Sequence, residues 1–177
     1  MKMGTVKLLL KSGVRVIGLD IDHHKVSMLE NGQSYIEHID AQNIKTSVVQ
    51  GVFIPSTDFS LAKNDDVSIL CVPTQLTRQR EPDLSFFTGS VDSLLPHLRD
   101  EQLLSLESTT YPRTTKDVIQ PRLEQAGFTI GQDFFLVYSP EREDPNNSNF
   151  IGFAIRLNYF AFGVMDVKPI YYSAHTF

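Results

Sequence analysis

The sequence predicts an α/β protein in which helices cover both faces of a parallel, doubly wound sheet. Four apolar segments, rich in β-branched residues, indicate strands at 14–21, 67–73, 103–109 and 134–140. Stretches with helical spacing, each with its own start and stop signals, separate these segments. Strands that alternate with helices along a chain are typical of a parallel sheet. The 177 residues are enough for one such domain with its own hydrophobic core.

The first predicted strand covers 14–21, and a helix follows it directly. Its segment VRVIGLDID is nearly continuous in apolar character up to the acidic end, as expected for a strand covered on both faces. Asp22 is placed to start a helix in the stretch HHKVSMLENG, in which Val26 and Leu29 lie three residues apart. Gly32 is predicted to stop this helix, because glycine readily adopts the left-handed conformation that follows helix ends.

A second helix and a short strand are predicted next. Asp40 is expected to cap the helix AQNIKTSVVQ, and Gly51 is expected to end it. The apolar positions expected to share one helix face are Ile44, Val48 and Val49. Residues 52–56 are predicted to form at most a short edge strand, because Pro55 has no N–H to donate.

The second half of the chain repeats the alternation of strands and helices. The strand at 67–73 is followed by a predicted polar loop, which contains Arg78, Arg80, Glu81 and Pro82. Ser85 is expected to cap a helix that runs through SVDSLLPHL. The strand at 103–109 leads to a capped helix, TTKDVIQPRLEQAG, that Gly127 stops. The segment 134–140 is the last predicted strand.

Composition and charge exclude several classes of protein. Hydrophobic residues make up 41% and charged residues 21% of the chain, which is ordinary for a soluble globular protein. The formal net charge is −5 and no basic run is present, so a nucleic-acid partner is not expected. A single cysteine excludes an internal disulfide and fits a reducing compartment, so we expect a cytoplasmic location. From Phe150 the chain is rich in aromatic residues, but its apolar run is shorter than the roughly 20 residues of a membrane span.

Polar side chains follow each predicted strand, at the edge of the sheet where ligands bind in parallel α/β proteins. Hydroxyls, carboxylates and a guanidinium there suit a polar ligand that carries alcohols and phosphates. These residues are Asp20, Asp22, Pro73, Thr74, Ser108, Thr109, Thr110, Ser139, Pro140, Glu141, Arg142 and Glu143. By themselves they predict a cleft and not a reaction.

Each of these features has a purely structural alternative. Asp20 could serve only as a helix cap or a turn residue, and Thr109 could only satisfy loop backbone groups. The adjacent His23 and His24 would point in different directions on a helix, so they make a poor metal pair. Cys71 lies within a β-branched strand, where a thiol usually behaves as a small hydrophobe. The charges of Glu141 and its neighbour could form a surface ion pair of little consequence.

The order of several short segments resembles a known family. IGLDID, NGQSYIEHI, FIPSTDFS, CVPT, REPDLSF, LESTTYP and YSPEREDP are similar, in sequence and spacing, to the N-terminal domain of the UDP-glucose/GDP-mannose dehydrogenase family. The similarity is closest to the bacterial-type UDP-N-acetylglucosamine and UDP-N-acetylmannosamine 6-dehydrogenases. It covers about residues 13–149.

The resemblance implies an NAD-dependent, four-electron oxidation of the primary alcohol of a UDP-sugar to a carboxylate, through a cysteine-linked intermediate. In the matching positions, Asp20 corresponds to the acid that binds the NAD ribose, and Thr74 to a threonine that contacts the cofactor. Thr109 corresponds to the threonine that lies near the nicotinamide and positions a catalytic water. Glu141 corresponds to a glutamate implicated in proton transfer and thioester hydrolysis, and Glu143 to a second glutamate there. Members of the family oligomerise.

The sequence also departs from the family pattern. The opening strand and the G-x-G turn that follows it have no counterpart, and residues 5–12 align with the helix after that turn. Gln75, Arg113 and Asn146 replace a proline and two glycines of the pattern, and the similarity stops at 150. We therefore expect a Rossmann-like, doubly wound parallel sheet that lacks its first strand. Residues 1–149 would form a truncated NAD-binding domain, and residues 150–177 an irregular tail from outside the family.

Three hypotheses about function follow from the sequence. The first is a nucleotide-sugar dehydrogenase homologue that is inactive as an isolated chain, because the cysteine nucleophile and the pyrophosphate-binding amides of the family are missing. The second is a non-enzymatic binding or interaction module that keeps the α/β scaffold. The third is another nucleotide-binding α/β protein, such as a methyltransferase, which the SPERED and ESTTYP segments disfavour.

Overall fold

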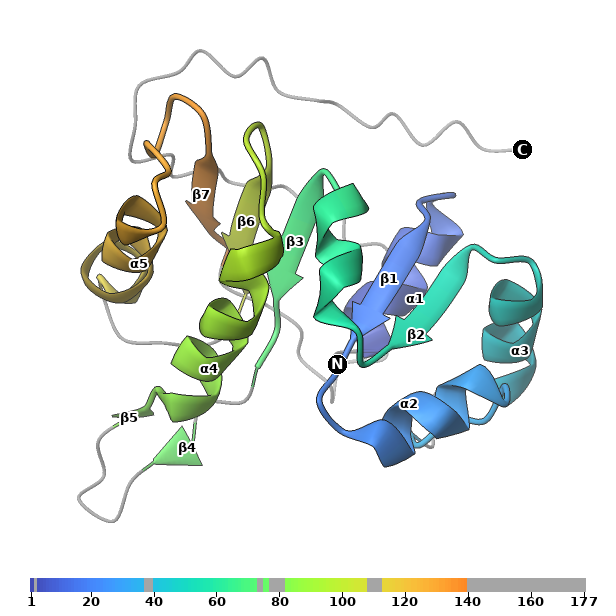
Figure 1. Ribbon diagram of the computed structural model, residues 1–177. Helices are drawn as coiled ribbons and strands as arrows, with labels where there is room; N and C mark the ends of the chain where they lie inside the picture. The colour runs from blue at the N-terminus through green and yellow to red at the C-terminus, as the bar shows by residue number, and fades with distance from the viewer. Residues whose placement is uncertain (2, 37–39, 73–74, 77–81, 108–112, 140–177) are drawn as a thin grey trace. The chain divides into compact units, whose positions relative to one another are not determined.

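The computed structural model describes two compact units (Figure 1). It describes residues 1, 3–36, 40–72, 75–76, 82–107 and 113–139. The first unit contains the described residues of Met1–Ala62, and the second contains those of Lys63–Asp166. The predicted tail at 150–177 lies outside the described residues. Within the described parts of the chain, no helix is both long enough and apolar enough to cross a membrane.

The first unit is a two-stranded parallel sheet with three helices. Strand β1 pairs with β2 in a register that places Val16 opposite Phe53 and Leu19 opposite Ser56. Among the described strands β2 pairs with β1 alone, so it is an edge strand of this sheet. An edge strand can contain Pro55, which has no N–H to donate. The elements in chain order are α1 (Met3–Lys11), β1 (Val16–Leu19), α2 (His23–Glu30), α3 (Ala41–Val49) and β2 (Phe53–Ser56).

The start and stop signals of α2 and α3 are confirmed. The carboxylate of Asp22 accepts the N–H groups of His24 and Lys25 at 3.0 and 3.3 Å, and the carboxylate of Asp40 accepts the N–H of Gln42 at 2.9 Å. The glycines after the two helices, Gly32 and Gly51, have φ of +69° and +70°. The predicted apolar face of α3 is wrong at one position, because Val49 is the last helical residue and is 78% exposed.

A small hydrophobic core holds the first unit together. The buried cluster joins β2 to the three helices and consists of Met3, Val6, Leu29, Ile44 and Phe53. Met1, Leu10, Val16, Tyr35, Ile36 and Val48 pack against it and remain partly buried. The helix α1 therefore supplies two core side chains, Met3 and Val6. The helix predicted at residues 5–12 is confirmed up to Lys11, and Ser12 lies in the turn that follows.

The second unit is built on a three-stranded parallel sheet of order β3-β6-β7, in which β6 is central. Figure 1 shows these strands side by side. A separate two-residue antiparallel ladder joins β4 to β5, inside the segment predicted to be only a polar loop. The elements are β3 (Val67–Leu70), β4 (Gln75–Leu76), β5 (Pro82–Asp83), α4 (Ser85–Leu94), η2 (Leu95–His97), β6 (Leu103–Leu106), η3 (Thr115–Ile119), α5 (Gln120–Gln125) and β7 (Phe135–Tyr138). The short helix η1 (Phe59–Asn64) precedes them and begins within the first unit.

Two helices of this unit differ from their predictions. Ser85 does not cap α4 but is its first residue, and its N–H is accepted by the carboxylate of Asp83 at 2.9 Å. The helix predicted around TTKDVIQPRLEQAG begins as a π-helix before it continues as α5. Pro121 explains this change, because a proline has no N–H for the carbonyl four residues earlier and its ring crowds that carbonyl. Gly127 ends α5 with φ +105°, as predicted.

The strand orders confirm the predicted fold class. A doubly wound sheet of order 3-2-1-4-5-6 has the orders 3-2 and 4-5-6 on the two sides of its first strand. The described strands have the corresponding orders, β2-β1 in the first unit and β3-β6-β7 in the second, and all of these pairs are parallel. No described strand takes the place of strand 1.

One buried hydroxyl in the centre of β6 gives a prediction about stability. Ser105 is 2% exposed and lies between Ile69 and Val137 in the register, and its hydroxyl has no hydrogen-bond partner among the described residues. An unpaired buried hydroxyl costs free energy, so Ser105→Ala is expected to raise the free energy of unfolding by about 1 kcal/mol. Urea denaturation of the two proteins measures the change. A destabilised variant would show that the hydroxyl does find a partner.

Candidate functional site

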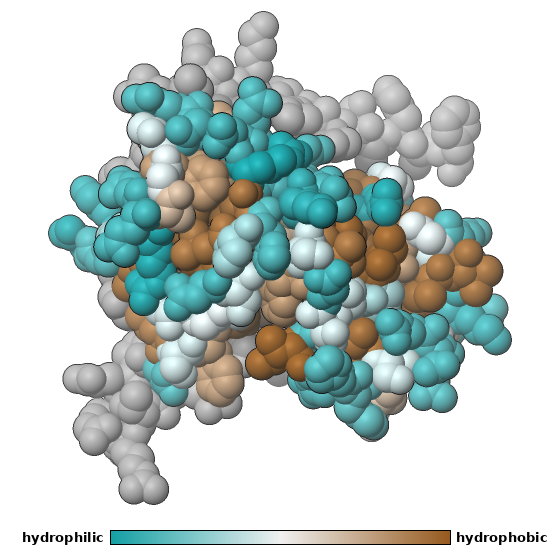
Figure 2. Space-filling model, viewed as in Figure 1, coloured by the Kyte–Doolittle hydropathy of each residue, from teal (hydrophilic) through white to brown (hydrophobic). Residues whose placement is uncertain are grey.

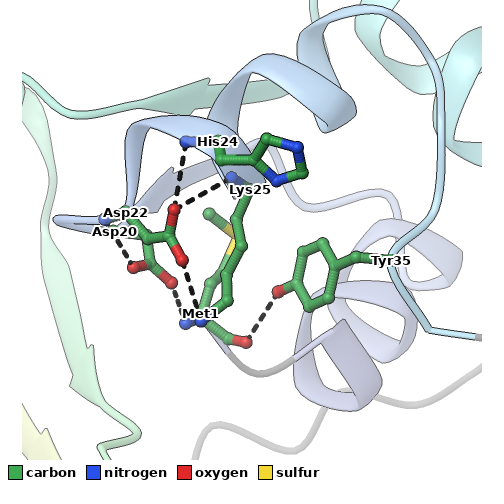
Figure 3. Close-up of polar contacts among 6 residues, drawn as sticks. All are labelled: Met1, Asp20, Asp22, His24, Lys25 and Tyr35. Atoms are coloured by element: carbon green, nitrogen blue, oxygen red, sulfur yellow. Dashed lines mark hydrogen bonds and ion pairs between the residues drawn. The ribbon is translucent and has the colours of Figure 1, made fainter.

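The first predicted site residue, Asp20, lies at the carboxyl end of β1. Its N–H donates to the carbonyl of Ser56 at 3.2 Å, so the ladder with β2 holds its backbone in place. One carboxylate oxygen, Oδ1, accepts the N–H of Asp22 at 3.0 Å. The other, Oδ2, accepts the terminal ammonium group of Met1 in an ion pair (Figure 3). The Asp20 side chain is only 10% exposed, so β1 presents a partly buried carboxylate at its tip.

The surroundings of Asp20 keep it ionised. Burial by itself raises the pKa of this carboxyl group, but the hydrogen bond from the Met1 ammonium and the one from the Asp22 N–H lower it. The positive charges of Met1 and Lys25 act in the same direction. The net result is a pKa below the ordinary value of 3.8, so Asp20 is an acceptor of hydrogen bonds at neutral pH.

This lowered pKa makes the stability of the first unit depend on pH. Because the folded-state pKa of Asp20 lies below 3.8, the ionised carboxylate stabilises the fold above about pH 4, and this contribution is lost as the pH falls through the lower value. We expect Asp20→Asn to be less stable than the parent chain at pH 6, and the gap to narrow as the solution is acidified to pH 2. Urea denaturation across this range measures the gap. A difference that stays constant with pH would contradict the assignment.

Tyr35 comes to the same place from the segment that follows α2. Its hydroxyl donates to the carbonyl oxygen of Met1 at 3.0 Å, and its ring lies 5.9 Å from the ammonium of Lys25 (Figure 3). Lys25 in turn pairs with the carboxylate of Asp22 at 3.4 Å. Burial, followed by the negative charges of Asp20 and Asp22, raises the pKa of Tyr35 to about 12. The phenol therefore keeps its proton and acts as a donor.

Sequence reasoning did not single out Tyr35 or Met1 as parts of this site. The contact between them joins positions that are 34 residues apart, and no local pattern predicts it. The only signal was that Tyr35 belongs to NGQSYIEHI, one of the segments that carried the family resemblance. Beside this cluster lies Ile21, which is 70% exposed and is one of the large hydrophobic side chains that reach the surface. Figure 2 shows such hydrophobic residues at separate places among hydrophilic ones.

The carboxyl ends of the second sheet also meet at one edge. The thiol of Cys71, directly after β3, lies 3.9 Å from a carboxylate oxygen of Glu107, directly after β6. The N–H of Ser139 after β7 donates to the carbonyl of Leu106 at 2.9 Å, so the third strand ends beside them. Four predicted site residues follow these strands in the sequence and lie outside the described residues, namely Thr74, Thr109, Glu141 and Glu143. Among the described side chains, no three of His, Cys, Asp and Glu are grouped to hold a metal ion.

The geometry of the first unit is that of a nucleotide-binding α/β domain. A carboxylate at the tip of a parallel strand, beside the start of a helix that packs on the same sheet, is where such domains bind the ribose and phosphates of a nucleotide. Here Asp20 supplies the carboxylate, and the contact with Met1 places the start of α1 next to it. Residues 3–151 match the model of the UDP-glucose/GDP-mannose dehydrogenase family, NAD binding domain. The chain belongs to this family, and the matching domain is the one that binds NAD.

Curated relatives agree with this assignment. The UDP-N-acetyl-D-mannosamine dehydrogenase of Methanococcus aeolicus is 29% identical over 147 residues, which are 81% of this chain and 32% of that protein. The UDP-N-acetyl-D-glucosamine 6-dehydrogenase of Pseudomonas aeruginosa is 29% identical over 133 residues, 75% of this chain and 31% of that protein. The chain therefore spans about a third of the length of the curated relatives that it matches.

Solved structures show the same fold. The UDP-N-acetyl-mannosamine dehydrogenase Cap5O from Staphylococcus aureus has a TM-score of 0.70 and 36% sequence identity, and the match covers 79% of this chain and 34% of that one. A UDP-D-ManNAc dehydrogenase from Pyrococcus horikoshii has a TM-score of 0.75 at 28% identity, over 81% of this chain and 34% of that one. The predicted Rossmann-like class is thereby confirmed.

Proposed function

We propose that this chain binds NAD as part of a nucleotide-sugar dehydrogenase, which oxidises the 6-hydroxyl of a UDP-sugar to a carboxylate. The observation that carries the proposal is the ionised, partly buried carboxylate of Asp20 at the tip of β1, in a chain whose family domain binds NAD. The relatives named above act on UDP-N-acetylmannosamine or UDP-N-acetylglucosamine, and we extend that substrate class to this protein.

Asp20 would hold the adenosine ribose. A carboxylate is an acceptor only, so its oxygens suit the two hydroxyl donors of a ribose. Oδ1 already accepts the N–H of Asp22, and Oδ2 accepts the ammonium of Met1, so a ribose would have to replace the ammonium at Oδ2. The exposed apolar side chain of Ile21 next to it offers a surface for the flat face of the base. The N–H groups in the first turn of α1 have no partner within their own helix, and they would face the diphosphate.

The chemistry would be completed by the residues that the family resemblance assigns. NAD, when bound, would supply the hydride acceptor for the sugar alcohol. Thr109 would position a water near the nicotinamide, Thr74 would contact the cofactor, and Glu141 and Glu143 would accept and return protons. The sole cysteine of the chain is Cys71, which follows β3 and donates its thiol to the carboxylate of Glu107 after β6. Because this thiol does not occupy the position of the family nucleophile, we expect no sugar oxidation by the isolated chain.

Titration of the purified chain with NAD tests the proposal. A ligand at ten times its dissociation constant adds about 1.4 kcal/mol to the free energy of unfolding, so millimolar NAD is expected to raise the melting temperature by several degrees. Nicotinamide mononucleotide, which has no adenosine ribose, is expected to leave the melting temperature almost unchanged. The absence of any shift at saturating millimolar NAD would refute cofactor binding by this chain.

A non-enzymatic binding or interaction module remains the second candidate. It is favoured by one observation, namely that the carboxylate of Asp20 is already paired with an ammonium group of the same chain. For such a module we expect no response to NAD together with the co-purification of a stoichiometric protein partner. Size-exclusion chromatography of the purified chain, followed by identification of any second component, decides between the two.

A further inference from the structure

We infer that Tyr35 is a positioning residue of the nucleotide site, whose hydroxyl fixes the backbone in front of α1 beside Asp20. The inference rests on the proposed binding of NAD, and it adds a residue that the family resemblance did not assign. Tyr35 would set the distance between the Asp20 carboxylate, which binds the ribose, and the start of α1, which faces the phosphates.

Three contacts meet at Met1, and Tyr35 makes one of them. The Tyr35 hydroxyl donates to the Met1 carbonyl at 3.0 Å, while the nitrogen of the same residue contacts Asp20 (Figure 3). The Met1 side chain lies directly on Gly18 of β1, where an added Cβ would come within 2.5 Å of the Met1 sulfur. The Met1 side chain on Gly18 and the Met1 carbonyl bonded to Tyr35 thus hold the backbone that enters α1 from both sides. Neither contact uses the ammonium that a ribose would replace at Asp20.

Tyr35 is itself held firmly enough to act in this way. Its ring is half-buried and packs against the core cluster that contains Met3 and Val6, both of which belong to α1. Its pKa of about 12 means that the hydroxyl keeps its proton throughout the physiological range and always donates. A tyrosine that is anchored through its ring and bonded through its tip has little freedom to move.

The effect of losing the Tyr35 hydroxyl on affinity depends on which parts of a ligand contact the protein. A dinucleotide that binds Asp20 through its ribose and α1 through its phosphates needs both groups at one fixed spacing. Adenosine alone contacts only the side of Asp20 and does not sense that spacing. Tyr35→Phe keeps the ring and its packing but removes the hydroxyl, so it is expected to weaken the dinucleotide selectively.

Calorimetric titration of the full chain with ADP-ribose, NAD and adenosine tests this expectation. Loss of one neutral hydrogen bond corresponds to about a three- to tenfold change in affinity. We expect Tyr35→Phe to raise the dissociation constants of ADP-ribose and NAD by this factor and to leave that of adenosine within twofold. The control is Thr46→Ala, which removes an exposed hydroxyl bonded only to Gln42 of its own helix and is expected to change none of the three constants.

A second measurement does not require that NAD binds. Amide hydrogen exchange in the first turns of α1 is expected to be at least threefold faster in Tyr35→Phe than in the parent chain, with exchange in α3 unchanged. Unchanged exchange in α1 would overturn the inference, as would an equal loss of affinity for adenosine and ADP-ribose. If the parent chain binds no NAD but α1 exchanges faster in the variant, the proposed function fails, while the contact by which Tyr35 holds the start of α1 stands.

Discussion

NAD is expected to bind about a hundredfold more weakly to Asp20→Ala than to the parent chain. In the proposed complex the carboxylate accepts hydrogen bonds from ribose hydroxyls, and a bond to a charged acceptor contributes about 1.5–3 kcal/mol. Isothermal titration calorimetry with NAD measures the change directly.

Two further variants separate the role of Asp20 in binding from its role in stability. Asp20→Asn keeps one oxygen acceptor and the shape of the side chain but loses the charge, so its affinity is expected to fall between those of Ala and the parent chain. Asp92→Asn removes a charge from the exposed pair with Arg122 in the second unit and is expected to leave NAD binding unchanged. If Asp20→Ala binds NAD as well as the parent chain does, Asp20 is only a partner of the N-terminus and the proposed ribose site is wrong.

Local chemistry explains which parts of the fold could be predicted. Asp22 and Asp40 accept N–H groups two or three residues away, and Gly32, Gly51 and Gly127 adopt positive φ, so these helix limits depend on a few neighbouring residues. The parallel strands could also be predicted locally, because a strand covered on both faces is a continuous apolar run. The local signal fails where two residues could each accept N–H groups at a helix start. Ser85 was predicted to cap α4, but it is the carboxylate of Asp83 that accepts an N–H there, that of Ser85 itself. The ladder of β4 and β5 is two residues long and has no periodicity to detect.

The candidate site was predictable only in part, because it depends on contacts between distant positions. Asp20 could be placed at a strand tip from the sequence, since the strand, its acidic end and the following cap are consecutive. The contacts of Met1 with Asp20 and Tyr35 span 19 and 34 residues and exist only because α1 packs on β1 and the loop after α2 returns to it. The roles predicted for Thr74, Thr109, Glu141 and Glu143 remain predictions, because these residues lie outside the part of the chain that the structure describes.

Phe53→Ala is expected to lower the stability of the first unit by about 3–5 kcal/mol, the largest effect of any single substitution considered for this chain. Phe53 is 1% exposed, belongs to the cluster with Met3, Val6, Leu29 and Ile44, and would lie 2.8 Å from a Cβ added at Gly18. The ring therefore packs between β1, the strand that ends at Asp20, and the helices of the first unit. Such a loss is comparable with the total stability of a small domain, roughly 5–15 kcal/mol.

Hydrogen exchange of the β1 and β2 amides is the appropriate measurement for Phe53→Ala, because it reports on the first unit alone. The matched control is Phe86→Ala in α4, where the ring is 45% exposed and the expected loss in the second unit is below about 1 kcal/mol. We further expect Phe53→Ala to lose NAD binding together with protection, because the carboxylate of Asp20 is positioned by the strand that this ring supports. The expectation would be contradicted if the β1 amides stayed protected in Phe53→Ala and Phe86→Ala were the more destabilising substitution. Such a result would mean that the core of the first unit does not depend on Phe53.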